Sequence, residues 1–390
     1  MQKLSRLIPV RLHCLLACVY FLMLPLSIAV NGSGASFLKL MSIPIGGYFL
    51  VCILLSGQKL KINVIHLLLC LYTIDLFTSM FTKPSSDMAM VLFGYVLNAG
   101  LFFCLSAVEY TEREMRLFYS AQVVLLAVLV VITLWNDAQY AERTTLTIFG
   151  QTSDPNYFVG FFIFPMAVTI ERVFRSKYRL WYFLLLCAAG YTVLLSGSRG
   201  GLLAVLALVL AASVLYPKGL LRKGAALVMV IGAVVLLWVA IRPFLPENIL
   251  ERFSIEAVLE TRGTYRMDIW QSMLREVADS TKTFLVGQGV GSQHHVFLNG
   301  RLENEVAHNH YIQALYDQGI LGLLLFLGLV GACILRCVKR RPAVAAAMIG
   351  MMALGLSLSF NASTKTLWNI VVYAAFSFPG GDGTDAPEGA

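Results

Sequence analysis

About twelve apolar runs, each close to 20 residues long, follow one another along a chain of 390 residues. A helix needs about 20 mostly apolar residues to cross the hydrocarbon core of a bilayer, so runs of this length restrict the possible folds severely. Water-soluble domains average roughly a quarter charged residues, whereas here 58% of the residues are hydrophobic and 13% are charged. The sequence therefore predicts an all-α polytopic membrane protein. The expected helices cover residues 12–30, 37–56, 62–80, 88–108, 117–135, 156–172, 180–197, 200–216, 224–243, 319–337, 342–360 and 364–378.

The basic residues support this arrangement because they concentrate on alternate connections. If the N-terminus is cytoplasmic, the inside connections carry Lys3, Arg6, Arg11, Lys59, Lys61, Arg113, Arg116, Arg172, Arg175, Lys177, Arg179, Lys218, Arg222, Lys223, Arg336, Lys339, Arg340 and Arg341. The short outside connections carry only Lys39, Lys83, Arg143, Arg199 and Lys365. The positive-inside rule therefore predicts cytoplasmic N- and C-termini. Because membrane topology accounts for the net charge of +8, we expect no nucleic-acid partner.

One outside connection differs from the others in length and composition. Residues 243–310 are polar and rich in turn formers, and a segment of this length is too long for a simple connector. We therefore divide the chain into nine membrane helices over 1–242, an extracytoplasmic loop with short helices over 243–310, and three membrane helices over 311–378. The acidic, low-complexity residues 379–390 predict a disordered cytoplasmic tail.

The segment SGSRGG, residues 196–201, places a charge between two expected membrane helices. Charged groups within a membrane are costly and are commonly functional. The charge alternation puts Arg199 at the outer membrane face, where Ser198 is a suitable N-cap for the next helix and Gly200 permits a close approach. A helix N-terminus favours anions, and a guanidinium matches phosphate oxygens. These residues indicate a phosphate site; an arginine that only contacts lipid headgroups is the alternative.

The far end of the long outside segment contains the sequence AHNHYIQALYDQG, residues 307–319. Its apolar spacing predicts a short helix that starts near Asn309, with His308 and His310 at the N-terminus. This position disfavours a protonated imidazole, and a neutral imidazole suits a general base. Both histidines remain candidates for the base. The four histidines of the segment lack a metal-ligand spacing such as H-E-x-x-H, so we expect neither a metal nor another cofactor.

A second amphipathic helix is predicted within TRGTYRMDIWQSMLREV, residues 261–277, because apolar residues recur at every fourth position. Arg266 lies one turn before Trp270, whose indole can stack on a guanidinium and hold it. Arg262 adds a second cation. The two arginines predict an anion site, and a solvated helix with incidental charges is the alternative.

Taken in order, these motifs resemble those of O-antigen ligases and Wzy-type polysaccharide polymerases. The matching stretches are SGSRGG at 196–201, YRMDIW at 265–270, VGQGVGS at 286–292 and AHNHYIQALYDQGILGLLLF at 307–326. The resemblance is clearest over about residues 150–330. It implies a GT-C-like membrane glycosyltransferase of the bacterial plasma (inner) membrane.

The resemblance also implies roles for particular residues. Such enzymes take glycan from an undecaprenyl diphosphate carrier at the outer face of the membrane and act without a divalent metal. By motif, Arg199 and Arg266 bind the donor diphosphate, and His308 activates the acceptor hydroxyl. We expect the substrate-binding set to be completed by Arg262, Ser198, Gly200, Asn309 and Tyr311.

The acceptor is not specified by these motifs. Polymerisation of a glycan and its ligation to lipid A-core, or to another lipid-linked acceptor, use the same donor. A transporter or flippase for lipid-linked sugars is a further alternative, since twelve helices suit that architecture. However, transporters commonly contain internal repeats, whereas here the long outside segment occurs once and the candidate residues lie at one face. The sequence therefore favours an enzyme.

Overall fold

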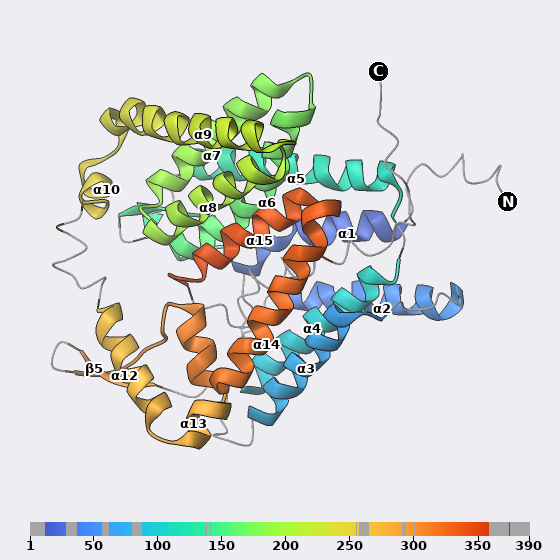
Figure 1. The fold of residues 1–390 in the computed structure, drawn as a ribbon, viewed down its shortest axis with the longest axis vertical. Coiled ribbons are helices and arrows are strands. Elements are labelled where there is room, and N and C mark those ends of the chain that lie inside the picture. The colour runs from blue at the N-terminus through green and yellow to red at the C-terminus, as the bar shows by residue number, and fades with distance from the viewer. Residues whose placement is uncertain are drawn as a thin grey trace.

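The computed structural model describes residues 12–28, 37–56, 62–79, 88–108, 110–136, 139–140, 142–254, 256, 265–290, 294–298, 301–358 and 374. Over these residues the protein is built mainly of helices, with three short antiparallel hairpins (Figure 1). The first eleven expected apolar runs each contain a helix. These are α1 (Leu12–Leu22), which is followed by the 3-10 helix η2 (Leu24–Ile28), α2 (Phe37–Ser56), α3 (Val64–Ser79), α4 (Met88–Ser106), α5 (Glu112–Asn136), α6 (Pro155–Arg175), α7 (Arg179–Leu195), α8 (Arg199–Leu215), α9 (Leu220–Ile241), α14 (His310–Arg340) and α15 (Pro342–Leu354).

Four of the described helices are long and apolar enough to cross a membrane. They cover 112–135, 155–175, 220–244 and 310–340. The other apolar helices are shorter, so the structure agrees with a helical membrane protein while the full set of twelve spans stays a prediction. The expected run 364–378, apart from residue 374, and the expected tail 379–390 lie outside the described residues.

The core that supports the site is formed by α6, α8 and α15. Most of α6 is buried, and the first half of α15, from Ala343 to Met348, is completely shielded. Small residues let these helices approach closely: a Cβ on Gly350 would lie 3.1 Å from the carbonyl oxygen of Ala204. Lipid is as apolar as a leucine side chain, so such close packing, rather than the hydrophobic effect, favours association of membrane helices. The start of α8 is thereby fixed against α6 and α15.

Helix α14 is kinked at Gly319, whose φ is 66°. The sequence predicted a short helix and a separate membrane helix from residue 319, and the structure joins them across this kink. Gly319 and Gly287 make the joint possible, because a Cβ on either would lie 2.4 Å from the backbone of the other segment. The turn after Gly287 is bonded to α14: the N–H groups of Gln288 and Gly289 donate to the carbonyls of residues 316 and 317 at 2.7 and 2.9 Å.

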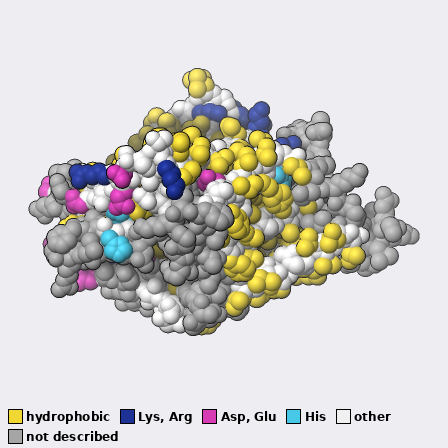
Figure 2. Space-filling view, turned by 90° about the horizontal axis from the view of Figure 1, so that it is seen from below, with side chains coloured by type: hydrophobic (Ala, Val, Ile, Leu, Met, Phe, Trp, Pro, Cys, Tyr) yellow, Lys and Arg dark blue, Asp and Glu magenta, His cyan; other side chains and the backbone are white. Residues whose placement is uncertain are grey.

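The polar part of the chain forms small elements between α9 and α14 in the sequence. They are the 3-10 helix η3 (Arg242–Phe244), α10 (Glu247–Arg252), α12 (Arg266–Ala278), α13 (Thr281–Val286) and the hairpin of β5 (His295–Leu298) with β6 (Arg301–Asn304). Two hairpins between α5 and α6 pair β1 (Gln139–Tyr140) with β2 (Arg143–Thr144) and β3 (Thr147–Ile148) with β4 (Gln151–Thr152). Figure 2 shows acidic, basic and histidine side chains gathered at one end of the molecule, beside a surface covered with hydrophobic side chains.

Candidate functional site

The turn between α7 and α8 is held in place by a network of short hydrogen bonds. Ser198 is the N-cap of α8: its hydroxyl accepts from the N–H of Gly201 at 2.9 Å, which confirms the cap predicted from sequence. The same hydroxyl donates to Asn156 Oδ1 at 2.6 Å. Asn156 is in turn bonded through its N–H to the carboxylate of Asp154, the N-cap of α6, at 2.7 Å. Two helix N-termini, those of α6 and α8, therefore meet at this point.

Arg199, the first residue of α8, is locked to a second arginine that the sequence did not single out. Its Nε donates to the carbonyl oxygen of Arg252 at 2.6 Å, and Arg252 Nε donates to the carbonyl oxygen of Gly197 at 3.3 Å. Gly197 has a φ of 57°, and a Cβ there would lie 3.1 Å from Arg252 Cδ. The last residue of α10 thus lies across the turn, and none of the described residues forms a hydrogen bond with the terminal nitrogens of Arg199.

Arg266 completes a cluster of four guanidinium groups. Burial is the largest influence on the Arg266 pKa and lowers it; Asp154 raises it, and further lowering comes from the positive charges of Arg199, Arg143 and Arg252. Arg143 also lies 4.0 Å from the Asp154 carboxylate. An arginine stays protonated in a protein, so Arg266 lies within electrostatic range of three other positive charges and of one carboxylate. The mutual repulsion of the four arginines favours a bound anion of more than one negative charge.

His308 lies beside this cluster in a left-handed backbone conformation, with a φ of 45°. Its ring is 41% exposed, and its Nε2 lies 3.8 Å from a carboxylate oxygen of Glu305. The pKa of His308 is lowered, first by burial of part of the ring and then by the charge of Arg266, while Asp154 acts in the opposite direction. The sequence attributed this shift to the helix N-terminus. The structure gives partial burial and Arg266 as its causes, and the result is the neutral imidazole that a base requires.

The peptide group of Ala307 holds His308 in position. Ala307 is completely buried; its carbonyl accepts from Trp270 Nε1 at 2.7 Å, and its N–H donates to Gln313 Oε1 at 2.9 Å. The sequence suggested that Trp270 can stack on Arg266, one turn earlier on α12; in the structure the indole N–H reaches the residue before the histidine. The indole therefore connects the helix that begins at Arg266 to the backbone of His308.

The neighbours of His308 in the motif have structural partners. Asn309 caps α14, accepting from the N–H groups of Tyr311 and Ile312 at 3.0 and 3.2 Å. The Tyr311 hydroxyl donates to the carbonyl of residue 352 at 2.6 Å, so it ties α14 to the end of α15. His310 is 3% exposed and its ring packs 4.5 Å from that of Phe326. Of the two candidate bases, only His308 has a solvent-accessible ring.

Gly200 requires a correction. The sequence suggested that its missing side chain makes room for a ligand, but a Cβ at this position would lie 1.4 Å from Ser357 Oγ and 2.4 Å from Ser357 Cβ. The space is therefore filled by the segment that follows α15. The absence of a side chain at Gly200 therefore serves packing inside the molecule, and the geometry gives no support to a contact with substrate.

Arg262, the remaining candidate, lies outside the described residues. Two cluster members were missed as site residues: Arg143 in β2 and Arg252 at the end of α10. The sequence did assign Arg143 to an outside connection and Arg252 to the long outside segment. Because both residues were predicted to lie on the outer side of the membrane, the sequence provided a weak indication that they could lie close together. Neither residue belongs to a recognisable local motif.

The site can be compared with known proteins at this point. Residues 182–327 match the family model described as O-antigen ligase. The matched region contains Arg199, Arg266 and His308, so the resemblance predicted from the motifs is confirmed over this part of the chain. No curated protein matches the chain.

Five chains of solved structures match this protein. One of them is described as "Structural coordination of polymerization and crosslinking by a peptidoglycan synthase complex". It is 17% identical, with a TM-score of 0.48, and the match covers 82% of this chain and 98% of that chain.

Proposed function

We propose that this protein is a membrane glycosyltransferase that polymerises or transfers glycan from an undecaprenyl diphosphate-linked donor. The observation that supports this most directly is the position of a partly exposed histidine beside Arg266, which belongs to a cluster of four arginines at one end of an apolar helical bundle. The match to the O-antigen ligase family agrees with a membrane protein of glycan polymerisation or ligation. The expected setting is the outer face of the bacterial plasma membrane, in the synthesis of a cell-surface polysaccharide.

In the proposed reaction the donor diphosphate binds at the arginine cluster. Arg199 and Arg266 contact its oxygens, with Arg252 and Arg143 adding positive charge. The acceptor hydroxyl oxygen attacks the anomeric carbon while the bond from that carbon to the diphosphate oxygen breaks. Negative charge grows on the leaving diphosphate, and cations already in place stabilise it without reorganisation. In the proposal, this step uses no metal.

His308 supplies the second requirement, a base for the acceptor. Its neutral imidazole takes the proton of the acceptor hydroxyl as the new bond forms. Attack from the side opposite the diphosphate inverts the configuration at the anomeric carbon. His310 is excluded from this role in the proposal because its ring is buried against Phe326.

The test uses purified protein and an undecaprenyl diphosphate-linked oligosaccharide. We expect Arg199→Ala and His308→Ala to abolish product, while the controls Arg275→Ala, on the exposed face of α12, and His295→Ala, on β5, retain it. Normal product from both site variants would overturn the proposal. Loss of wild-type activity with a chelator would show that a metal takes part.

The products decide between the remaining alternatives. Longer glycans on the carrier identify a polymerase, and transfer to lipid A-core or another lipid acceptor identifies a ligase. Movement of an unchanged donor across the bilayer would identify a transporter. We favour glycosyl transfer over transport because the arginine cluster lies beside a base, which moving a lipid-linked sugar does not require.

A further inference from the structure

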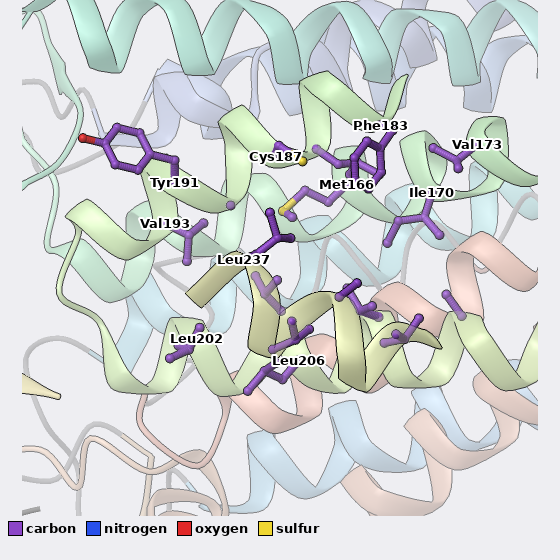
Figure 3. Close-up of a pocket in the computed structure, with 18 of the residues that line it drawn as sticks. Met166, Ile170, Val173, Phe183, Cys187, Tyr191, Val193, Leu202, Leu206 and Leu237 are labelled. Atoms are coloured by element: carbon purple, nitrogen blue, oxygen red, sulfur yellow. The ribbon is translucent and has the colours of Figure 1, made fainter. Parts of the chain in front are cut away.

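The pocket between α6, α7, α8 and α9 offers no partner for the proposed base. It has a volume of about 440 Å³, and Figure 3 shows side chains from these helices pointing into it. Among the described residues that line it there is neither a carboxylate nor a basic side chain. A group that assists His308 therefore has to come from the polar segments around the ring.

His308 takes up its proton beside a positive charge, which makes the resulting imidazolium costly. Burial and the charge of Arg266 lower the pKa of His308, while Asp154 acts in the opposite direction. Asp154 is already engaged, because its carboxylate accepts from the N–H and the side-chain amide of Asn156 at 2.7 and 2.9 Å. An opposite charge within about 4–6 Å favours the protonated form of a histidine. A second carboxylate at the ring would therefore offset the effect of Arg266.

Glu305 is a carboxylate that lies beside the His308 ring. Its Oε2 is 3.8 Å from His308 Nε2, and its side chain is 28% exposed. This distance is longer than a hydrogen bond. Hydrogen bonds between catalytic groups are often long in the absence of substrate and shorten in the complex. The two side chains are therefore close enough to bond once the imidazole carries a proton on both nitrogens.

The backbone of this segment is fixed at two points, so the separation of Glu305 and His308 is set by the fold. The N–H of Glu305 donates to the carbonyl oxygen of His294 at 2.9 Å. Between the two side chains, the N–H and the carbonyl of the buried Ala307 both have hydrogen-bond partners. Groups that are already held in place lose little conformational freedom when they form a contact.

His294, which anchors Glu305, is itself held by a contact between three elements. Its side chain is 1% exposed, and its Nδ1 lies 3.0 Å from Oε1 of Glu276 on α12. The other oxygen of Glu276 accepts from the hydroxyl of Tyr316 on α14 at 2.9 Å. The ring of Tyr316 packs 5.3 Å from that of His294. The segment before β5 is thereby tied to both α12 and α14, and the position of Glu305 follows from that packing.

We propose that Glu305 is a positioning residue for His308; the inference rests on the proposed function. Nε2 is the ring nitrogen that lies 3.8 Å from Glu305, so the carboxylate keeps a proton on Nε2 and leaves the lone pair on Nδ1. As the acceptor oxygen bonds to the anomeric carbon, its proton passes to Nδ1, and the leaving diphosphate takes the electron pair of the bond that breaks. The imidazolium is then flanked by a carboxylate as well as by Arg266. Loss of its proton to solvent restores the base.

The test compares the pH profiles of kcat/KM for the undecaprenyl diphosphate-linked donor in three variants and the wild type. Glu305→Gln keeps the shape of the side chain and removes its charge, and Glu305→Asp keeps the charge on a shorter side chain. Glu247→Gln is the matched control, because Glu247 is an exposed residue at the start of α10. The donor titrates identically in every case, so a difference between the profiles reports the protein.

We expect Glu305→Gln to move the acid limb of kcat/KM to lower pH, because an imidazolium without its carboxylate is less stable and the pKa of His308 falls. Above this limb, kcat/KM should fall about tenfold, which is less than the roughly 100-fold or more that a general base contributes. The smaller effect is expected because water screens a partly exposed carboxylate. Glu305→Asp should leave the limb closer to its wild-type position, and Glu247→Gln should change neither the limb nor the rate.

The outcomes separate this inference from the proposed function. An acid limb that stays at the wild-type pH in Glu305→Gln would overturn the role of Glu305 alone, whether or not the rate falls, since a residue that only supports the loop leaves the limb in place. If Glu305→Gln does not fold, as judged by thermal unfolding, Glu305→Ala removes the same charge and decides instead. No product from the wild type, or normal product from His308→Ala, would overturn the proposed base and this inference with it.

Discussion

Replacing Trp270 by phenylalanine keeps a ring on α12 but removes the N–H that donates to the Ala307 carbonyl at 2.7 Å. Ala307 is completely buried, and a buried acceptor without a partner costs about 1–3 kcal/mol. His308, the next residue, has a φ of 45°. A non-glycine residue in this region is strained by roughly 1–3 kcal/mol and keeps its conformation only when its surroundings enforce it. The free energy lost with this hydrogen bond is therefore similar to the strain energy of the His308 backbone conformation that the bond helps to maintain.

We expect the substitution to reduce kcat, because it releases the proposed base. If the whole loss of about 1–3 kcal/mol appears in the transition state, kcat falls by about 5-fold to about 150-fold. The KM for the donor should change little, since the bonds of Arg199 to Arg252 are untouched. This split between kcat and KM distinguishes a residue that positions the base from one that only supports the fold.

The assay follows turnover of an undecaprenyl diphosphate-linked oligosaccharide at several donor concentrations. Trp135→Phe serves as the control, because that side chain is 85% exposed at the end of α5. An unchanged kcat in Trp270→Phe would refute the argument. A higher donor KM with an unchanged kcat would show instead that Trp270 acts through Arg266.

Three further predictions follow from the site and its supports. Burial and Arg266 lower the pKa of His308, and only the unprotonated ring acts as a base. We therefore expect kcat/KM to stay constant as the pH falls through the usual histidine pKa of about 6.5 and to decline only at lower pH. A decline centred above about pH 6.5 would contradict the role of His308 as the base. Gly200→Ala should lower the thermal unfolding temperature through overpacking worth about 1–3 kcal/mol, and adding Ser357→Gly should restore much of the loss; no recovery would exclude the Ser357 contact as the cause. Asn309→Ala removes the α14 cap and should destabilise the protein by about 0.5–2 kcal/mol, whereas Asn309→Asp should retain most of the stability; equal effects in thermal unfolding would speak against the cap.

Much of the helical layout could be predicted from sequence, because a helix in lipid must satisfy its own backbone and so leaves a continuous apolar run. Local hydrogen bonding explains a second success. Ser198 caps α8, as predicted, through an N–H three residues away; the helix predicted to start near Asn309 does start there, and Asn309 caps it through N–H groups two and three residues away. Such bonds depend only on neighbours in the chain, so the residue type and its place before an apolar run were sufficient.

The cluster itself could not be predicted in full. Arg143, Arg199, Arg252 and Arg266 come from four separate elements, and their meeting depends on how β2, α8, α10 and α12 are placed in the fold. The contact of Gly200 with Ser357 likewise joins residues that are 157 positions apart. Neither the arginine cluster nor the contact between Gly200 and Ser357 produces a periodic pattern in the sequence. The residue type at a position on one element does not reveal which residues of another element pack against it.

By itself, the sequence determined where most of the apolar helices lie, that Ser198 caps one of them, and which stretches resemble the O-antigen ligase family. The tertiary structure decided that Arg252 and Arg143 join Arg199 and Arg266, and that His308 rather than His310 has an accessible ring. It also decided that SGSRGG is a packed turn whose glycine meets Ser357. The physical reason is the distance along the sequence over which each feature is determined. Helix caps and apolar periodicity depend on residues a few positions apart. The arginine cluster and the packing at Gly200 depend on elements that come together only when the chain has folded.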